Sequence, residues 1–358
     1  MAAVPRAGTV AVTGSAGFIG GWVVRRLLDK GYRVRACVRD ANDPERTDFL
    51  KAMPGYASGR LTLHSADLDD AGSFDDIFAG CHGVCHVSHV STYDDLDYVR
   101  TVCDQLIESV NRSGTVNRVV VTSSIAAVIA ASDIDDWTRR PVFYEDRYPD
   151  EYNPELKGGL HGGYSLAKMI AERAFSDAAK ASGGWDAITC CPADNVGPIQ
   201  SAHQKDMGPW QRNVQMMLLG RYNQNAGYRP WMTVDVRDNA ECHVRLLESV
   251  LVSNGERYIA WSTEMHPVEE ICASIDRLLP ELGHDTPEVT DNLPDYVQVQ
   301  EATYRAIWAK ADLRNDRIRA VTGIEFRPFD ESLRDCVESL LAVAGVKPKL
   351  REGYSLRA

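Results

Sequence analysis

Three glycines spaced three residues apart, Gly14, Gly17 and Gly20, constrain the fold of this chain more than any other feature. They follow a β-prone run at 8–13 and precede a helical pattern whose apolar residues, at 22–28, are spaced to pack on a sheet. Strand, glycine turn and helix in this order are typical of a dinucleotide-binding unit, with the phosphates at the helix N-terminus. A plain glycine turn is the alternative, and the flanking strand and helix favour the nucleotide site.

Strand patterns and helical patterns then alternate along the chain. This alternation predicts an α/β fold, a Rossmann-type doubly wound parallel sheet with a smaller, mostly C-terminal substrate lobe. We expect residues 1–191 to form the dinucleotide-binding domain, with a return segment at about 234–262. The Pro/Gly-rich exit at 192–198 marks its border, so 192–233 and 263–358 should form the substrate-binding lobe and a tail. Further strands are expected at 32–38, 61–66, 83–87, 118–122, 185–191 and 256–261, and helices at 96–113, 267–281 and 329–344.

The end of the second expected strand indicates which dinucleotide binds. In such folds this point contacts the adenosine ribose, where an acid would bind the 2′-hydroxyl of NAD. Arg39 stands there instead, and a guanidinium offers paired contacts to the 2′-phosphate of NADP. Arg35 and Arg46 could also contact this phosphate, whereas Asp40 is an acid that argues for NAD. Alternatively, Arg39 is only a solvent-exposed residue at the end of a strand.

Composition limits the partners of the chain. The net charge is −12 over 358 residues, which argues against nucleic acid or an anionic membrane as the main partner. The longest apolar-leaning stretch, 119–131, is interrupted by polar residues and is shorter than the ~20 residues that span a bilayer. Nine cysteines without framework spacing predict reduced thiols in a cytoplasmic enzyme. We expect a monomer or homodimer that binds a small molecule.

The cluster Cys81, His82, Cys85, His86 and His89 invites a metal interpretation. Its cysteine spacing is permitted at zinc sites. However, residues 83–87 are expected to form a strand, whose side chains alternate between two faces. No second Cys/His pair at ligand spacing follows, so packed thiols and imidazoles are the preferred interpretation, and no metal site is expected.

Two further segments carry candidate chemistry. Tyr164 and Lys168 are four apart and would lie on one face of a helix. A free phenol titrates near ~10. An adjacent ammonium favours the phenolate, so the pair is a candidate general acid/base.

Thr122, Ser123 and Ser124 end the fifth expected strand and put hydroxyls at the carboxyl edge of the sheet, where α/β sites are built. Residues 133–163 are polar and irregular, and their length suits a lid.

The glycine turn, Arg39, Asp67-Leu68, Thr122-Ser123-Ser124 and Tyr164-x-x-x-Lys168 occur in one order at compatible distances. Together they resemble the extended short-chain dehydrogenase/reductases, most of all the group of dihydroflavonol reductases, cinnamoyl-CoA reductases and yeast-type aldehyde reductases. Residues 12–20, 38–40, 83–87 and 164–172 carry the likeness, which is dense over 9–200 and thin beyond.

The resemblance implies an NADPH-dependent carbonyl reductase that also runs backward as an alcohol dehydrogenase. Tyr164 would donate a proton to the substrate carbonyl, and Lys168 would assist Tyr164 and bond the nicotinamide ribose. Ser124 would hydrogen-bond the carbonyl oxygen, with Ser123 as the open alternative. Asp67 is placed to reach the adenine amino group, with a helix cap as its alternative or additional role. The candidate cofactor contacts are Gly14, Ser15, Gly17, Phe18, Ile19, Gly20, Arg39, Asp67, Leu68, Val87, Ser88, Thr122, Tyr164, Lys168, Pro192, Asn195 and Val196.

Departures from the family pattern limit the substrate. Dihydroflavonol reductases carry an asparagine shortly after the catalytic serine, whereas residues 125–130 are apolar here. The stretch before the tyrosine in cinnamoyl-CoA reductases is replaced by Leu160-His161-Gly162-Gly163. Neither a flavonoid nor a CoA-thioester pocket is therefore expected.

An NAD-dependent nucleotide-sugar epimerase or dehydratase is the alternative enzyme, disfavoured by Arg39 and by the lack of acids beside Ser124. A non-enzymatic NADP sensor is the third hypothesis, disfavoured by the intact Ser/Tyr/Lys set.

Overall fold

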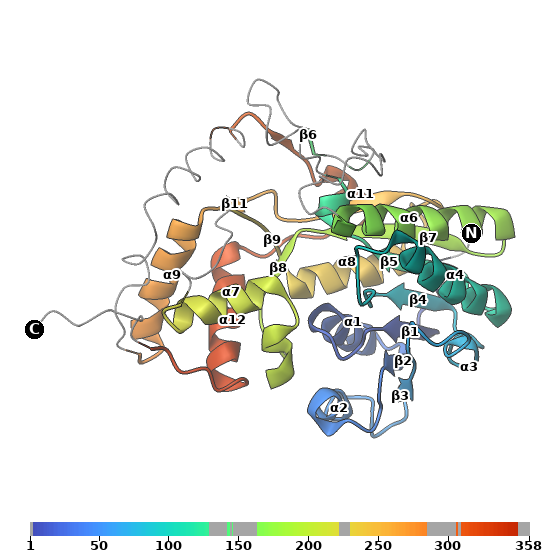
Figure 1. Ribbon diagram of the computed structural model, residues 1–358, viewed down its shortest axis with the longest axis horizontal. Helices are drawn as coiled ribbons and strands as arrows, with labels where there is room; N and C mark the ends of the chain where they lie inside the picture. Colours follow the sequence, from blue (N-terminus) through green and yellow to red (C-terminus); the bar gives the residue numbers. More distant parts are fainter. Residues whose placement is uncertain are drawn as a thin grey trace, which may run out of the picture.

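A seven-stranded parallel sheet forms the centre of the molecule (Figure 1). The computed structural model describes residues 3–128, 142–143, 145, 163–221, 230–284, 306 and 309–349. The strand order is β10-β7-β5-β4-β1-β2-β3, and every neighbouring pair is parallel. The strands are β1 (Thr9–Thr13), β2 (Arg33–Val38), β3 (Leu61–Ser65), β4 (Gly83–His86), β5 (Arg118–Thr122), β7 (Asp186–Pro192) and β10 (Arg257–Ala260). Strands buried on both faces read as continuous apolar runs, as β1 and β5 do.

Helices cover both faces of this sheet. On one face α1 (Phe18–Asp29) and α8 (Val236–Glu248) pack against each other and share an apolar core with Val10, Val12 and Val120 of the strands. On the other face α3 (Asp75–Phe78), α4 (Leu96–Ser113) and α6 (Gly163–Ser182) share a second core with the alternate strand residues. Two further helices, α2 (Pro44–Lys51) and α11 (Asp316–Thr322), add residues to the first core. The sheet is therefore doubly wound.

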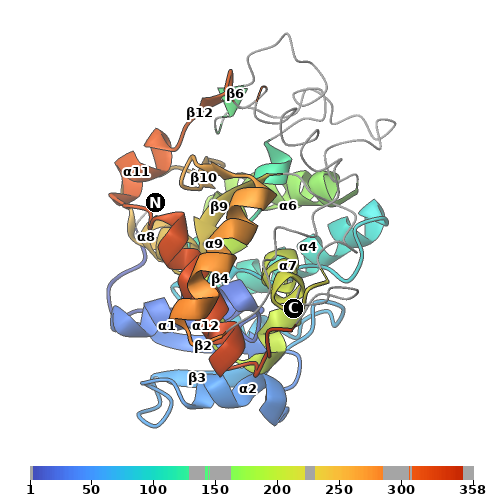
Figure 2. The ribbon, with the colours of Figure 1, turned by 90° about the vertical axis from the view of Figure 1, so that its left-hand side faces the viewer.

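A second, smaller body of structure lies to the left of the large sheet in Figure 1 and faces the viewer in Figure 2. Its helices α7 (Pro209–Leu218), α9 (Val268–Glu281) and α12 (Phe329–Ala342) have an apolar core of their own. It includes a three-stranded sheet of β8 (Asp194–Val196), β9 (Trp231–Asp235) and β11 (Met265–His266). Short elements complete the described fold: η1 (Ile125–Ala127), η2 (Ala202–Asp206) and the pair β6 (Val142–Phe143) and β12 (Asp312–Leu313).

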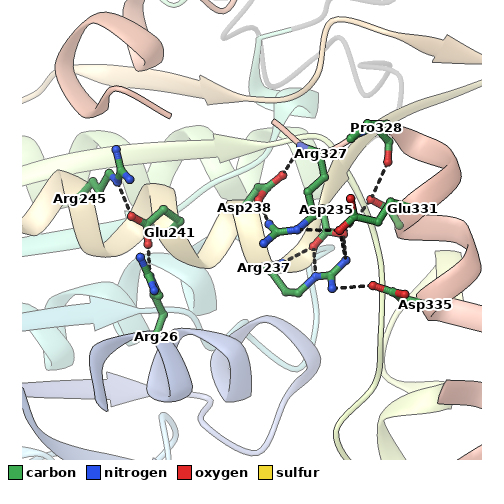
Figure 3. Close-up of polar contacts among 11 residues, drawn as sticks. Arg26, Asp235, Arg237, Asp238, Glu241, Arg245, Arg327, Pro328, Glu331 and Asp335 are labelled. Atoms are coloured by element: carbon green, nitrogen blue, oxygen red, sulfur yellow. Dashed lines mark hydrogen bonds and ion pairs between the residues drawn. The ribbon is translucent and has the colours of Figure 1, made fainter. Parts of the chain in front are cut away.

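Helix α8 connects the two bodies through ion pairs (Figure 3). Glu241, at its middle, pairs with Arg26 of α1. Near its N-terminus Arg237 contacts Asp335 of α12 at 2.6 Å, and Asp238 pairs with Arg327 just before α12. One helix thus packs on the large sheet and holds the helical lobe.

The predicted fold class is confirmed, and most predicted elements agree with the structure to within one or two residues. The main difference lies in the Pro/Gly-rich exit at 192–198. There Asp194–Val196 form β8, and its partner β9 begins at Trp231, three residues before the predicted return segment. Strands of three residues are too short to show a periodic pattern, so the small sheet was not predicted. The predicted lid at 133–163 and most of the predicted tail lie outside the described residues.

Within the described residues, none of the helices is long and apolar enough to cross a membrane. All nine cysteines lie in described segments as buried free thiols.

Candidate functional site

A cavity of about 920 Å³ opens along the carboxyl edge of the large sheet. The last residues of β5 and β7, Thr122 and Pro192, line it, as do the segments that follow β1, β2, β3 and β4. This volume and this position suit a dinucleotide and a small second molecule. Of the predicted site residues, the cavity brings together Gly14, Gly17, Phe18, Ile19, Gly20, Arg39, Asp67, Leu68, Val87, Ser88, Thr122, Ser124, Tyr164, Lys168, Pro192 and Asn195.

The glycine turn is tight and packs closely on the segments around it. Gly14 has φ +67°, and a Cβ there would lie 2.9 Å from the Ser88 nitrogen. A Cβ on Gly20 would lie 2.1 Å from the Gly14 carbonyl oxygen, so only glycine lets α1 pack this closely on the turn. Gly17 is the N-cap of α1 and provides no side-chain acceptor to the first backbone amides of the helix. Those amides and the positive end of the helix dipole can serve an anion.

Two predicted cofactor contacts do not reach the cavity. Ser15 is fully buried, and its hydroxyl donates to the Val12 carbonyl at 2.7 Å. Val196, at the end of β8, is buried in the core of the helical lobe. Both follow predicted contact residues closely in sequence, but their side chains point into the protein interior instead. Ser15 therefore stabilises the turn, and Val196 packs the lobe.

Beyond the end of β2 the cavity is lined by two exposed arginines, Arg39 and Arg46. Arg46 lies 3.7 Å from the Asp43 carboxylate. Arg35, the other suggested helper, does not line the cavity, because it donates to the carbonyls of Ile77 and Ala79 at 2.6 and 2.7 Å. Arg39 and Arg46 are thus the cations available to a phosphate at this end.

The acids near this end have local partners. Asp40 accepts a hydrogen bond from the Asn42 amide at 2.8 Å, closing a turn. Asp67 accepts one from the Asp69 amide at 3.1 Å, so it closes a turn after β3 rather than capping a helix. Asp67 and Leu68 both line the cavity.

A buried hydrogen-bond cluster fixes the ends of β1 and β4 together. The Thr13 hydroxyl accepts from the amides of Val87 and Ser88 at 3.0 and 3.1 Å and from the Ser88 hydroxyl at 2.8 Å. Its own proton is then left for His86 Nδ1 at 3.0 Å. Burial, and then the charge of Lys168, lower the pKa of His86 to about 3, so the ring is neutral. The loop after β4 is thereby held against the glycine turn.

The two serines after β5 have different partners. Ser123 is buried, and its hydroxyl donates to the Glu172 carboxylate, which pairs with buried Arg257 at 2.8 Å. Ser124 is half-buried, and its Oγ accepts from the Ala126 amide at 3.1 Å. A hydroxyl that accepts in this way keeps its proton for a further acceptor. Ser124 can donate into the cavity, whereas the proton of Ser123 is engaged by Glu172.

Helix α6 presents Tyr164 and Lys168 to the same cavity. The Lys168 ammonium donates to the Thr122 carbonyl at 3.0 Å and lies 5.7 Å from the Tyr164 ring centroid. The Thr122 hydroxyl is engaged elsewhere, at 2.7 Å from His243 Nε2. The predicted contact of Thr122 with a cofactor would therefore have to use other atoms of that residue.

Several cavity-lining residues were not predicted individually. Tyr93, in the loop after β4, meets Tyr164 edge-to-face with ring centroids 4.9 Å apart. Gly163 is needed there, because a Cβ on it would lie 2.5 Å from the Tyr93 carbonyl oxygen. The loop that contains Tyr93 begins at the carboxyl end of a parallel strand, where α/β sites are built. This position could have identified Tyr93 as a candidate from the sequence. The lobe side adds Ala193, Asp194, Met207, Gly208, Pro209, Trp210, Gln211 and Met232, within or next to the segments predicted to bind a substrate.

The Cys/His cluster does not gather around one point. Cys81 donates to the Ile77 carbonyl at 3.2 Å, and His82 Nδ1 accepts from the Thr9 amide at 3.2 Å. His86 belongs to the cluster around Thr13. In the described segments, no group of three or more His, Cys, Asp or Glu residues could hold a metal ion.

Comparison with known proteins places this chain among reductases on the same fold. The model of the NAD dependent epimerase/dehydratase family matches residues 10–260. Cinnamoyl-CoA reductase CAD2 of Medicago truncatula is 30% identical over 92% of this chain and 95% of its own length. Dihydroflavonol 4-reductase of Callistephus chinensis is 31% identical over 76% of this chain and 73% of its own. Yeast methylglyoxal/isovaleraldehyde reductase, solved with NADPH, has a TM-score of 0.75 at 20% identity and covers 94% and 99% of the two chains.

Proposed function

This chain belongs to the NAD dependent epimerase/dehydratase family as an extended short-chain dehydrogenase/reductase, and on that premise we propose that it is an NADPH-dependent carbonyl reductase. It would convert an aldehyde or ketone to an alcohol reversibly. The observation that carries the proposal is one cavity lined by Ser124, Tyr164, Lys168, the glycine turn and Arg39. The relatives that match most of the chain are reductases, which supports the same reaction.

The residues of the cavity fit NADP(H). Gly14 and Gly20 let the turn pack tightly against Ser88 and the start of α1, and the amides at the start of α1 suit the diphosphate. Arg39 and Arg46 would hold the 2′-phosphate. Asp67 would accept from the adenine amino group, and Lys168 would bond the nicotinamide ribose. When bound, the reduced nicotinamide supplies the hydride.

The chain itself would manage the charge and the proton at the substrate oxygen. Ser124 would donate its free proton as a hydrogen bond to the carbonyl oxygen, stabilising negative charge as it develops. Tyr164 would give its phenolic proton to that oxygen. Lys168, held by the Thr122 carbonyl, would keep a positive charge close to Tyr164 and favour release of that proton.

A nucleotide-sugar epimerase or dehydratase is the second candidate, because the matching family is described as an epimerase/dehydratase family. Arg39 disfavours it, because tightly held NAD calls for an acid at the end of β2. Ser124 is followed by Ile125 and Ala126, both buried and apolar, where a dehydratase would need acids. Reduction of a carbonyl is therefore the better supported reaction.

A substrate panel tests the proposal. Purified protein is mixed with NADPH and a series of aldehydes and ketones, and the loss of reduced cofactor is followed at 340 nm. We expect oxidation of NADPH with at least one carbonyl class and much slower oxidation of NADH. Conversion of a UDP- or GDP-sugar without any carbonyl reduction would reject the reductase in favour of the epimerase.

We also propose the division of labour within the chain. Residues 1–191 with the returning α8 and β10 would bind the dinucleotide, and 192–233 with 263–358 would bind the substrate, as a monomer or homodimer. A cytoplasmic location agrees with nine free thiols.

A further inference from the structure

The short helix η2, which packs against α7 of the helical lobe, reaches the glycine turn of the large sheet. His203 Nε2 lies 2.8 Å from the Ala16 carbonyl oxygen. Because a carbonyl only accepts, this nitrogen carries a proton, and Nδ1 accepts from the Ser201 hydroxyl at 3.0 Å. The neighbouring Gln204 donates from Nε2 to the carbonyls of Ala16 and Gly17 at 3.3 and 3.2 Å. Two lobe side chains thus hold two consecutive carbonyls of the turn.

The side chain of Gln204 is closely packed into this contact. It is fully buried, and its Oε1 accepts from the Gln200 amide at 2.8 Å, which leaves Nε2 for the turn. Gly21, in the first turn of α1, leaves space for the amide, because a Cβ there would lie 3.2 Å from Gln204 Nε2. Trp22 of α1 donates to the Pro198 carbonyl at 2.8 Å and holds the chain that leads to η2. The contact is therefore a packed junction between the lobe and α1.

Holding these carbonyls fixes the amides in the same peptides. A trans peptide is planar, so its C=O and its N–H point in opposite directions. The Gly17 carbonyl shares a peptide with the Phe18 amide, the first amide of α1, and the first amides of a helix have no acceptor within it. A hydrogen bond donated to a carbonyl also polarises its peptide and makes the N–H a better donor. Gln204 thus fixes the direction of an amide at the positive end of α1.

The junction borders the cavity at the glycine turn. Gly17, Phe18 and Ile19 line the cavity, as does Met207, which follows η2 directly. A Cβ on Gly17 would lie 4.0 Å from Met207 Cε, so this methionine lies beside the N-cap of α1. The lobe therefore meets the sheet at the part of the cavity where the helix N-terminus can serve an anion.

We propose that His203 and Gln204 are positioning residues for the cofactor. They hold the Ala16 and Gly17 carbonyls so that the first amides of α1 bind the diphosphate of NADP(H). The segment 192–233, proposed above to bind the substrate, then also completes the cofactor site. This role rests on NADP(H) as the cofactor of the proposed function and does not require that a carbonyl is reduced.

Two ligands that differ in the diphosphate test the role of Gln204. NADPH carries the diphosphate and the 2′-phosphate, whereas adenosine 2′-monophosphate carries the 2′-phosphate alone. We expect Gln204→Met, which removes the donated hydrogen bonds at similar volume, to weaken NADPH binding about tenfold or more. The same variant should bind adenosine 2′-monophosphate within about twofold of wild type. Gln215→Met, the same replacement on α7 outside the cavity lining, should change neither affinity. Fluorescence titration measures NADPH, and calorimetry measures the nucleotide.

His203 provides a second set of variants, because its side chain is only half-buried and its replacement should leave the fold intact. His203→Ala should weaken NADPH binding about three- to tenfold, since one hydrogen bond to the turn is lost. His203→Gln keeps a donor for the Ala16 carbonyl and should restore NADPH affinity to within about twofold of wild type. Adenosine 2′-monophosphate should bind all of these variants alike.

The outcomes separate this role from the reductase function. Unchanged NADPH affinity in both Gln204→Met and His203→Ala overturns the role, and so does equal weakening of the two ligands, which would indicate general disruption. Weakening of NADPH alone, in a protein that reduces no carbonyl, supports the role while the reductase function fails. If Gln204→Met does not fold, the two His203 variants decide by the same criteria.

Discussion

At the scale of single residues, the site depends on which atoms keep a free proton. Ser123 and Ser124 are neighbours of the same type, yet one donates to Glu172 and the other accepts from the Ala126 amide. The resemblance favoured Ser124, but the sequence could not exclude Ser123, because Glu172 is 49 residues from Ser123 and Arg257 is 85 residues from Glu172. Partners this distant in sequence cannot be inferred from spacing. The hydrogen bonds favour Ser124 as the residue that contacts the substrate.

Replacing each serine separately tests this assignment. Ser124→Ala should lower kcat by about 10²–10³-fold, the effect of removing one donor to a developing oxyanion. Ser123→Ala should keep most of the activity and lose about 1–3 kcal/mol of stability, because Glu172 loses a buried donor. Steady-state kinetics and urea unfolding of both variants provide the measurement. Loss of turnover in Ser123→Ala with normal turnover in Ser124→Ala would reverse the assignment.

We propose that Arg39, which lines the cavity after β2, carries the preference for NADPH over NADH. Removing a charge-assisted contact of about 1.5–3 kcal/mol should weaken NADPH binding about 10–150-fold in Arg39→Ala. NADH, which lacks the 2′-phosphate, should be affected less than about threefold on the same scale. Arg35→Ala is the matched control, because Arg35 is engaged by the Ile77 and Ala79 carbonyls. Fluorescence titrations of both cofactors measure the effect, and equal weakening of the two in Arg39→Ala would refute it.

At the scale of elements, the long helices were predictable and the short strands were not. Apolar periodicity and end signals placed α4 at its observed bounds, with Asp95 accepting from the first amides and Gly114 ending it in the left-handed conformation. Helices α9 and α12 also agree with the prediction within two residues. By contrast β8 and β11 have three and two residues, and pairing with β9 alone defines them.

Helix α8 illustrates how one element joins distant parts of the chain. Its Glu241 pairs with Arg26 of α1 and with Arg245 one turn later (Figure 3). The Lys30 ammonium also lies 3.4 Å from the Glu241 carboxylate. Burial would raise the pKa of Glu241, but the hydrogen bonds from Arg26 and Arg245 outweigh it and lower that pKa to about 2. The ionised carboxylate is therefore the form that stabilises the fold.

The acid dependence of stability follows from this shift. A carboxyl group whose pKa falls from about 4.5 in the unfolded chain to about 2 contributes stability above pH 4.5 and loses it as the pH falls toward 2. Because Arg26 and Arg245 are 39% and 35% exposed, solvent screening reduces the contribution to about 1–2 kcal/mol. Glu241→Gln should lose this amount at pH 7 and progressively less below pH 4.5.

Urea unfolding of Glu241→Gln between pH 7 and pH 3 measures the contribution. Glu108→Gln is the matched control. The Glu108 carboxylate lies 2.7 Å from the Arg112 guanidinium, and both side chains are well exposed at the surface. A stability difference between Glu241→Gln and wild type that stays constant down to pH 3 would contradict the ion-pair explanation.

At the scale of the whole molecule, the cavity lies where the doubly wound sheet meets the helical lobe. The sheet contributes the glycine turn and the ends of β5 and β7, while the start of α7 and the two residues before it contribute Met207 to Gln211. The sheet side could be predicted residue by residue, because each contact follows a strand end. The lobe side could be predicted only as a region, because its side chains reach the cavity through packing between distant segments. This difference explains why the reaction is better defined than the substrate.

The central claim is that Tyr164 delivers the proton while NADPH reduces a carbonyl. The most direct measurement compares Tyr164→Phe with wild type on the best carbonyl of the panel, together with NADPH titrations of both proteins. We predict a fall in kcat of at least about 10²–10⁴-fold, the contribution of a positioned general acid, with NADPH affinity within about twofold of wild type. A variant that keeps most of its turnover, or that fails only because it no longer binds NADPH, would contradict the claim.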